Sequence, residues 1–169
     1  MDAMPAWALA LTYWLHMLAT VVWLGSLSAL ALLVLPAAAR TLNADAQVTL
    51  INAIQPRLET LSWGSMAVLV ATGMFQMSGD ENFTGLISTE NTWSAAMLTK
   101  HLLVLVMGAF SVWMSWGLLP EIRRAILRYK KSGDPAEVLA LRQREARLMR
   151  ISLAMALLIL AVTATMQVL

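Results

Sequence analysis

The sequence predicts an all-α integral membrane protein, a four-helix bundle formed by one domain over residues 1–169. Three observations predict this class. First, 59% of the residues are hydrophobic and 13% are charged, whereas globular proteins average about 25% charged residues. Second, the mean hydropathy is +0.68. Third, four stretches of the chain carry the roughly 20 apolar residues that a membrane-spanning helix needs.

Each predicted helix follows one of these stretches. The first covers about 5–35. The second covers about 56–77, and Pro56 suits the first turn of a helix because its missing N–H would have no partner there. The third covers about 93–119 and the fourth about 149–169. The first and third are longer than the bilayer requires, so we expect them to tilt or to project from it.

The three connections differ in character. Residues 38–55 mix polar and apolar side chains at helical spacing, which predicts a short interfacial helix. Residues 78–92 are rich in turn formers and acidic, and they contain no lysine or arginine. Residues 120–148 form a strongly basic connection. Gly133-Asp134-Pro135 interrupts it, because glycine and proline are strong breakers, and we expect helix on both sides.

The charge distribution predicts the topology. Nine of the 12 lysines and arginines lie between residues 120 and 150, and the positive-inside rule places this basic loop in the cytoplasm. Both termini then face outward (N-out/C-out). We expect the membrane to be a bacterial inner (plasma) membrane. The predicted partner of the basic loop is the anionic lipid bilayer, and no nucleic-acid partner is predicted.

Several function classes are excluded by absences in the sequence. The chain has no cysteine, which excludes disulfides, thiolate metal ligands and iron–sulfur clusters. No phosphate-binding or nucleophile-elbow motif is present. The first apolar stretch follows no basic segment and is about twice as long as the 7–15 residues of a signal-peptide core. We therefore expect it to remain as a helix.

Ionisable residues inside the predicted spans are the strongest functional signal. His16 lies in the first helix, and Lys100 and His101 are adjacent in the third. Such groups are costly at membrane depth and usually face a site or a partner. At 1.5 Å per residue, all three fall in the outer half of the bilayer. The second helix runs in the opposite direction, so its Thr72 and Gln76 reach the same level.

The helical period indicates which of these residues share a face. His16, Thr20 and Trp23 lie on one stripe of the first helix, because residues three or four apart are neighbours on a helix surface. Lys100 and His101 are rotated by about 100° from one another, so they cannot both point directly at one spot. The sequence leaves open which of the two faces the site.

Haem b is the favoured cofactor. Imidazoles on facing helices of a bundle are suitable axial ligands, and the bundle interior can bury the porphyrin. We predict haem b between the first and third helices, with His16 as one ligand and Lys100 or His101 as the other. The role would be electron transfer or redox chemistry with a quinone or a membrane redox partner, which would include an oxidoreductase activity. The remaining predicted cofactor-binding residues are Thr20, Trp23, Thr72 and Gln76.

Two alternatives remain open. Copper is the first, because thioether sulfur suits Cu(I) and imidazole suits either oxidation state. Its predicted ligands are His16, His101, Met17 and Met97. The chain has 12 methionines, although methionine is also a common core filler. The second alternative is a cofactor-free structural subunit of a membrane complex or homo-oligomer, in which replacing His16 would lower assembly but change no spectrum.

The segments LHMLATVVWLGSLSALALLVLPAAAR, ATGMFQ and LTKHLLVLVMGAF together resemble the copper resistance D (CopD) family. The first resembles that family's first helix, with a His (His16), a Trp-hydrophobic-Gly-Ser stretch from Trp23 and a closing Pro36. The second resembles the Thr-Gly pair of the next helix (Thr72). The third resembles the helix with a lysine before an apolar run (Lys100). The resemblance implies a membrane protein associated with copper uptake or tolerance.

The same pattern is similar to the HemJ-type protoporphyrinogen oxidases. These are small four-helix membrane proteins with a histidine in the first helix and a lysine in a later one. That resemblance implies that His16 and Lys100 matter at a haem or porphyrin site. The chain departs from this family because it lacks the longer aromatic and histidine-rich signature after the first Trp-Gly region, and because it adds His101.

Overall fold

The computed structural model describes residues 5–78 and 92–166. These residues form helices and no strands. Four of their helical runs are long and apolar enough to cross a membrane, which confirms the predicted all-α membrane class. Residues 1–4, 79–91 and 167–169 lie outside the described residues. Most of the predicted acidic loop 78–92 and the last residues of the predicted fourth helix are therefore not described.

The first span is a continuous helical run in three parts: α1 (Ala6–Ser28), a π-helical segment η1 (Ala29–Val34) and α2 (Leu35–Thr41). It extends six residues beyond the predicted end at residue 35. The second span, α3 (Ala44–Ser78), follows almost at once. Asn43 caps its first turn, since the side-chain oxygen of Asn43 accepts a hydrogen bond from the Ala46 N–H at 2.9 Å.

The predicted start of the second helix at residue 56 was wrong. Pro56 lies inside α3, and the helix begins 12 residues earlier at Ala44. A proline removes one helical hydrogen bond, but here tertiary packing outweighs that loss. Val48 and Ile51, which precede the proline, are 7% and 3% exposed and belong to the hydrophobic core. The expected interfacial helix at 38–55 is therefore divided between the end of α2 and the start of α3.

The second half of the chain, like the first, has a long helical run that contains a π-helical segment, followed by a second long helix. It comprises α4 (Thr92–Trp113), a π-helical segment η2 (Met114–Leu118), α5 (Leu119–Ser132) and α6 (Ala136–Met166). The predicted basic loop 120–148 is thus mostly helical. It is broken only around Gly133, as predicted, with helix on both sides.

The turn at Gly133 has a clear physical origin. Gly133 ends α5 with φ 75°, a left-handed conformation that glycine adopts without steric cost. Its N–H bonds the Tyr129 carbonyl oxygen at 2.8 Å, which closes the helix end. The Asp134 carboxylate accepts a hydrogen bond from the Ala136 N–H at 2.9 Å and starts α6. Two helices can therefore reverse direction within three residues.

Each π-helical segment ends two residues before a proline. In η1, the Leu35 N–H bonds the Leu30 carbonyl five residues back, and Pro36 follows. In η2, the Leu119 N–H bonds the Met114 carbonyl, and Pro120 follows. A proline ring clashes with the carbonyl four residues before it. The wider π turn relieves that clash without ending the helix.

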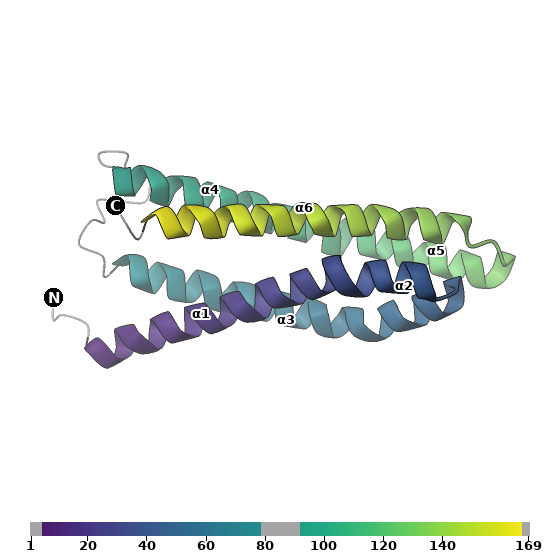
Figure 1. Ribbon diagram of the computed structural model, residues 1–169, viewed down its shortest axis with the longest axis horizontal. Helices are drawn as coiled ribbons and strands as arrows, with labels where there is room; N and C mark the ends of the chain where they lie inside the picture. The colour runs from purple at the N-terminus through teal and green to yellow at the C-terminus, as the bar shows by residue number, and fades with distance from the viewer. Residues whose placement is uncertain (1–4, 79–91, 167–169) are drawn as a thin grey trace.

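The helices are arranged as two pairs, with α1 beside α3 and α4 beside α6 (Figure 1). The pairs lie close together at the end of the bundle that carries α2 and α5, and they diverge toward the other end. Segments α1 and η1 also contact α6. The beginnings of α1 and α4 lie at the same end as the last turns of α3 and α6 (Figure 1). The predicted N-out/C-out orientation fits this arrangement and remains a prediction.

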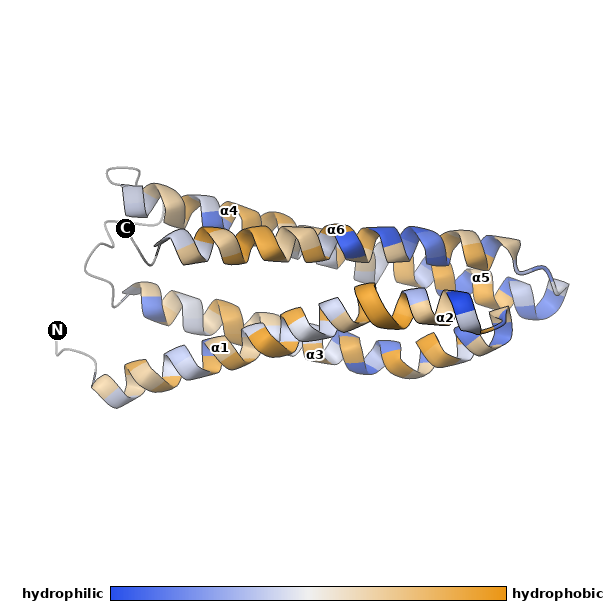
Figure 2. Ribbon diagram, viewed as in Figure 1, coloured by the Kyte–Doolittle hydropathy of each residue, from blue (hydrophilic) through white to orange (hydrophobic). Residues whose placement is uncertain are grey.

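The hydrophobic core is concentrated at the end with α2 and α5. A larger cluster centres on Met114, Leu118 and Ile122, and a smaller one joins Leu30, Leu35 and Ile51. Hydrophilic residues gather at this same end, whereas the middle of the bundle is mostly hydrophobic (Figure 2). Many apolar side chains of the spans are exposed on the single chain, which is the surface that a lipid bilayer would cover.

Candidate functional site

His16 on α1 is held by Thr72 on α3. The His16 Nδ1 lies 2.8 Å from the Thr72 Oγ1. The Thr72 hydroxyl has a single hydrogen, and it donates that hydrogen to the Val68 carbonyl oxygen at 2.6 Å. The hydroxyl must therefore accept from His16, whose proton is on Nδ1. The lone pair of His16 Nε2 is left free to bind a metal ion or a proton.

A second hydrogen bond joins α1 and α3, one helical turn from His16 and Thr72. The Gln76 side-chain amide donates to the Thr12 carbonyl oxygen at 3.3 Å. Thr20 instead donates to the carbonyl of His16 itself, at 2.8 Å, so this hydroxyl bonds within α1. A Cβ placed on Gly73 would lie 3.6 Å from the His16 Cε1, which is ordinary contact. The small size of Gly73 is therefore not what admits the imidazole.

The two adjacent candidate ligands on α4, Lys100 and His101, have different surroundings. Lys100 is partly buried and interacts electrostatically with His16 across the bundle. His101 donates its Nδ1 hydrogen to the Met97 carbonyl oxygen, 2.7 Å away on the same helix, because a carbonyl can only accept. The structure thus brings Lys100 within electrostatic reach of His16. The Nε2 lone pair of His101 is also free of this bond.

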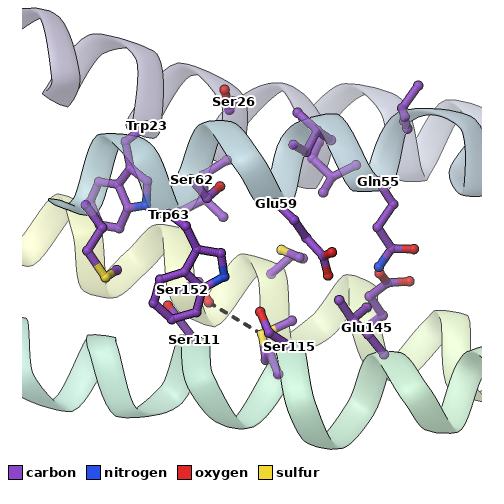
Figure 3. A pocket seen from close by; sticks show the side chains of 18 of the residues that line it. Trp23, Ser26, Gln55, Glu59, Ser62, Trp63, Ser111, Ser115, Glu145 and Ser152 are labelled. Carbon is purple, nitrogen blue, oxygen red and sulfur yellow. Dashed lines mark hydrogen bonds between the residues drawn. The ribbon is translucent and has the colours of Figure 1, made fainter. Parts of the chain in front are cut away.

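A cavity of about 110 Å³ lies between the helix pairs, further toward the end with α2 and α5 (Figure 3). Trp23 on its wall is seven residues along α1 from His16, or about 10 Å at the helical rise. All four spans contribute to the lining. Gln55 of α3 and Glu145 of α6 point toward one another in Figure 3. The wall also carries hydroxyl groups, from Ser26, Ser62, Ser111, Ser115 and Ser152.

Methionine sulfur is the other prominent feature of this wall. The methionines come from α3, α4, η2 and α6: Met66, Met107, Met114 and Met149. Met107 and Met114 are 2% and 5% exposed. The Ser152 hydroxyl donates a weak hydrogen bond to the Met114 sulfur at 3.9 Å. The cavity therefore combines soft sulfur donors with hydroxyl and carboxylate oxygens.

The carboxylates at the cavity are paired to different degrees. Glu145 is 1% exposed and accepts a hydrogen bond from Arg142 at 2.7 Å. Arg142 is itself 8% exposed, and its Nε and Nη2 have no hydrogen-bond partner within the described residues. Glu59 lies 3.7 Å from Arg123, whose side chain is exposed. The charge of Glu145 is thus offset inside the bundle, whereas that of Glu59 is only weakly offset.

Comparison with known protein families matches residues 52–166, more than half of the chain, to the family described as copper resistance protein D. This chain belongs to the CopD family. No curated protein and no solved structure matches it. The resemblance predicted from the sequence is confirmed, although the matched region begins after the first helix that carried much of it. The resemblance to the HemJ-type proteins has no counterpart in this match.

Within the CopD chain, some predicted site residues lie together and others do not. His16 and Thr72 are hydrogen-bonded, and Gln76 bonds one turn away. Lys100 lies within electrostatic reach of His16. Met17 is 68% exposed, so its sulfur lies on the outer surface of the single chain. Trp23 lines the separate cavity.

The cavity wall was missed by the sequence reasoning. Only ionisable residues deep in the predicted spans were followed, and the late predicted start of the fourth helix left Glu145 in a loop. The spacing of Met107 and Met114, seven residues apart on one helix face, was a usable signal.

The described CopD geometry gives the predicted haem no support. Cofactor sites are usually cavities of about 300–1,000 Å³. The cavity of about 110 Å³ is smaller and is not lined by His16, Lys100 or His101. Residues 5–78 and 92–166 also contain no group of three or more His, Asp or Glu side chains that could hold a metal ion. A metal site here would need methionine sulfur or isolated histidines.

Proposed function

We propose that this protein binds and moves copper within the membrane and so contributes to copper tolerance. The observation that carries the proposal is the family match over residues 52–166, because that family is described by copper resistance. Four membrane-spanning helices provide the setting for moving an ion, and the methionine-rich composition provides ligands suited to Cu(I).

The orientation of the histidine rings supports the proposal. We propose that His16 and the residues around it are the first that copper contacts. Metal-binding histidines usually donate their second ring N–H to a neighbouring oxygen, which orients the ring and presents the other nitrogen. His16 is oriented in this way by Thr72, and His101 by the Met97 carbonyl. Both imidazoles thus offer Nε2 as a ligand, in agreement with the copper alternative predicted from the sequence.

Haem b with electron transfer to a quinone or redox partner is the competing proposal. The same free Nε2 atoms could bind haem iron. Copper is favoured because the family description names copper. A bacterial inner-membrane location with the basic segments in the cytoplasm is part of the proposal, as is the possibility of a homo-oligomer.

The proposal is tested by copper-dependent growth. A copper-sensitive bacterial strain expresses the wild-type chain, a His16→Ala variant or an empty vector, and cell copper is measured by mass spectrometry. We expect the wild-type chain to raise the copper concentration that inhibits growth and to change cell copper, with no effect on zinc. Growth and metal content identical to the empty vector would contradict the proposal. A haem absorption spectrum that depends on His16 would favour the competing one.

A further inference from the structure

The methionine-lined cavity is the strongest unassigned feature of the molecule. It lies on the bundle interior, about 10 Å along α1 from His16, and none of the sequence-predicted ligands except Trp23 touches it. Its sulfur-bearing residues come from α3, α4, η2 and α6. A methionine that only fills a core leaves little free space around it. Here the methionines border a space large enough for an ion with several ligands or waters.

We infer that this cavity is a binding site for a soft monovalent cation, Cu(I), held by thioether sulfurs. Thioethers are neutral and polarizable, so they prefer Cu(I) over hard cations. Met107 and Met114 are the central donors because both are almost fully buried. The inference rests on the proposed copper function and gives that function an internal site, distinct from the His16 level.

The charges around the cavity favour a single positive charge. A buried cation is stable only when a nearby negative charge offsets it. Arg142 already offsets Glu145, whereas Glu59 is held only weakly by Arg123 at 3.7 Å. One carboxylate is therefore available, which matches Cu(I). Ca²⁺ and Mg²⁺ require six or more oxygen ligands, and the described residues show no cluster of carboxylates that could supply them.

The backbone at the cavity supports the same assignment. Met114 opens the π-helical segment η2, and Ser115 follows it on the cavity wall. π turns frequently occur at functional sites because they alter the direction of the side chains within a helix. The hydroxyl of Ser152 on α6 donates to the Met114 sulfur. This bond links η2 to α6 at the cavity, so the sulfur is positioned by a second span.

Cu(I) binding to the purified full-length chain tests the inference. The protein in detergent is titrated with Cu(I), kept reduced by ascorbate, against a chromogenic Cu(I) chelator, and X-ray absorption reports whether sulfur surrounds the copper. The test variant is M107L/M114L, since leucine replaces methionine with little change in volume. The matched control is M74L/M155L, which makes the same change at two methionines that do not line the cavity and are not among the predicted ligands. Circular dichroism and gel filtration establish that each variant is folded.

We expect M107L/M114L to bind Cu(I) about 10- to 100-fold more weakly, since even indirect changes around a metal commonly cost that much. The sulfur signal should fall, and M74L/M155L should resemble the wild type. If M107L/M114L does not fold, Glu59→Gln replaces it and should weaken binding while keeping the sulfur signal. Wild-type affinity in M107L/M114L, or an equal loss in M74L/M155L, overturns the internal site but leaves a copper growth effect intact. Absence of both Cu(I) binding and the growth effect would instead refute the proposed function.

Discussion

His16 on α1 donates its Nδ1 hydrogen to the Thr72 hydroxyl on α3, 2.8 Å away, because the hydroxyl has already given its own hydrogen to Val68. This relay fixes the imidazole tautomer and ties the first span to the second. Its consequence is that Nε2 is the ring nitrogen left to bind a ligand, within electrostatic reach of Lys100. The first prediction depends on this bond.

Thr72→Val should destabilise the protein by about 1–3 kcal/mol, because the substitution leaves a partly buried donor on His16 without its acceptor. Valine keeps the shape of threonine, so packing is preserved. Nitrogen NMR should also show loss of the single Nδ1–H tautomer at His16. The matched control is Thr99→Val, since Thr99 is exposed and bonds only the Ala95 carbonyl of its own helix. Equal thermal stability of the Thr72 variant and the control would refute the relay.

Glu145→Gln should be strongly destabilising, by about 3–5 kcal/mol, because it leaves the buried guanidinium of Arg142 without its charged partner. The double variant Arg142→Met/Glu145→Leu should recover most of that loss, since no unpaired charge remains. Denaturant midpoints in detergent measure both effects. Glu137→Gln breaks an exposed pair with Arg128 and should change little, because solvent screens surface pairs. A double variant less stable than Glu145→Gln would contradict this account.

The N-out/C-out orientation predicts opposite labelling of the two ends of the bundle. The chain has no cysteine, so each introduced cysteine is the only thiol. Lys131→Cys on α5 and Thr92→Cys on α4 are both at exposed positions. A membrane-impermeant maleimide should label Thr92→Cys in intact spheroplasts and Lys131→Cys only in inside-out vesicles. The reverse pattern would invert the topology, because the basic segments would then face outward.

Gly133→Ala should cost about 1–2 kcal/mol, because alanine is strained in the left-handed conformation that Gly133 adopts at φ 75°. Gly133→Asn should cost less, since asparagine tolerates this region. The control is Gly73→Ala, where the added Cβ would meet the His16 Cε1 at an ordinary 3.6 Å and the helix would gain propensity. Thermal unfolding compares the three variants. Equal losses at Gly133 and Gly73 would show that backbone conformation is not the cause.

The sequence predicted the number and class of the spans because those depend on local composition. A bilayer requires long apolar helices with every backbone group bonded internally, and such stretches can be counted directly. The break at Gly133-Asp134-Pro135 was also predictable, since glycine and proline act on the backbone locally. The common level of His16 and Thr72 was predictable from depth, because helices that cross the same membrane place residues of equal depth at one level.

Only the tertiary structure decided where α3 begins, how the helices are rotated and which residues of different spans are in contact. Pro56 could not begin α3, because Val48 and Ile51 before it bury against other helices and extend the helix backward. Which of Lys100 and His101 approaches His16 depends on how α4 is rotated against α1, and rotation is set by packing between helices. The methionine cavity and the Arg142–Glu145 pair arise only where residues from separate spans converge. Sequence determines which residues each helix carries, whereas helix packing determines which of them meet.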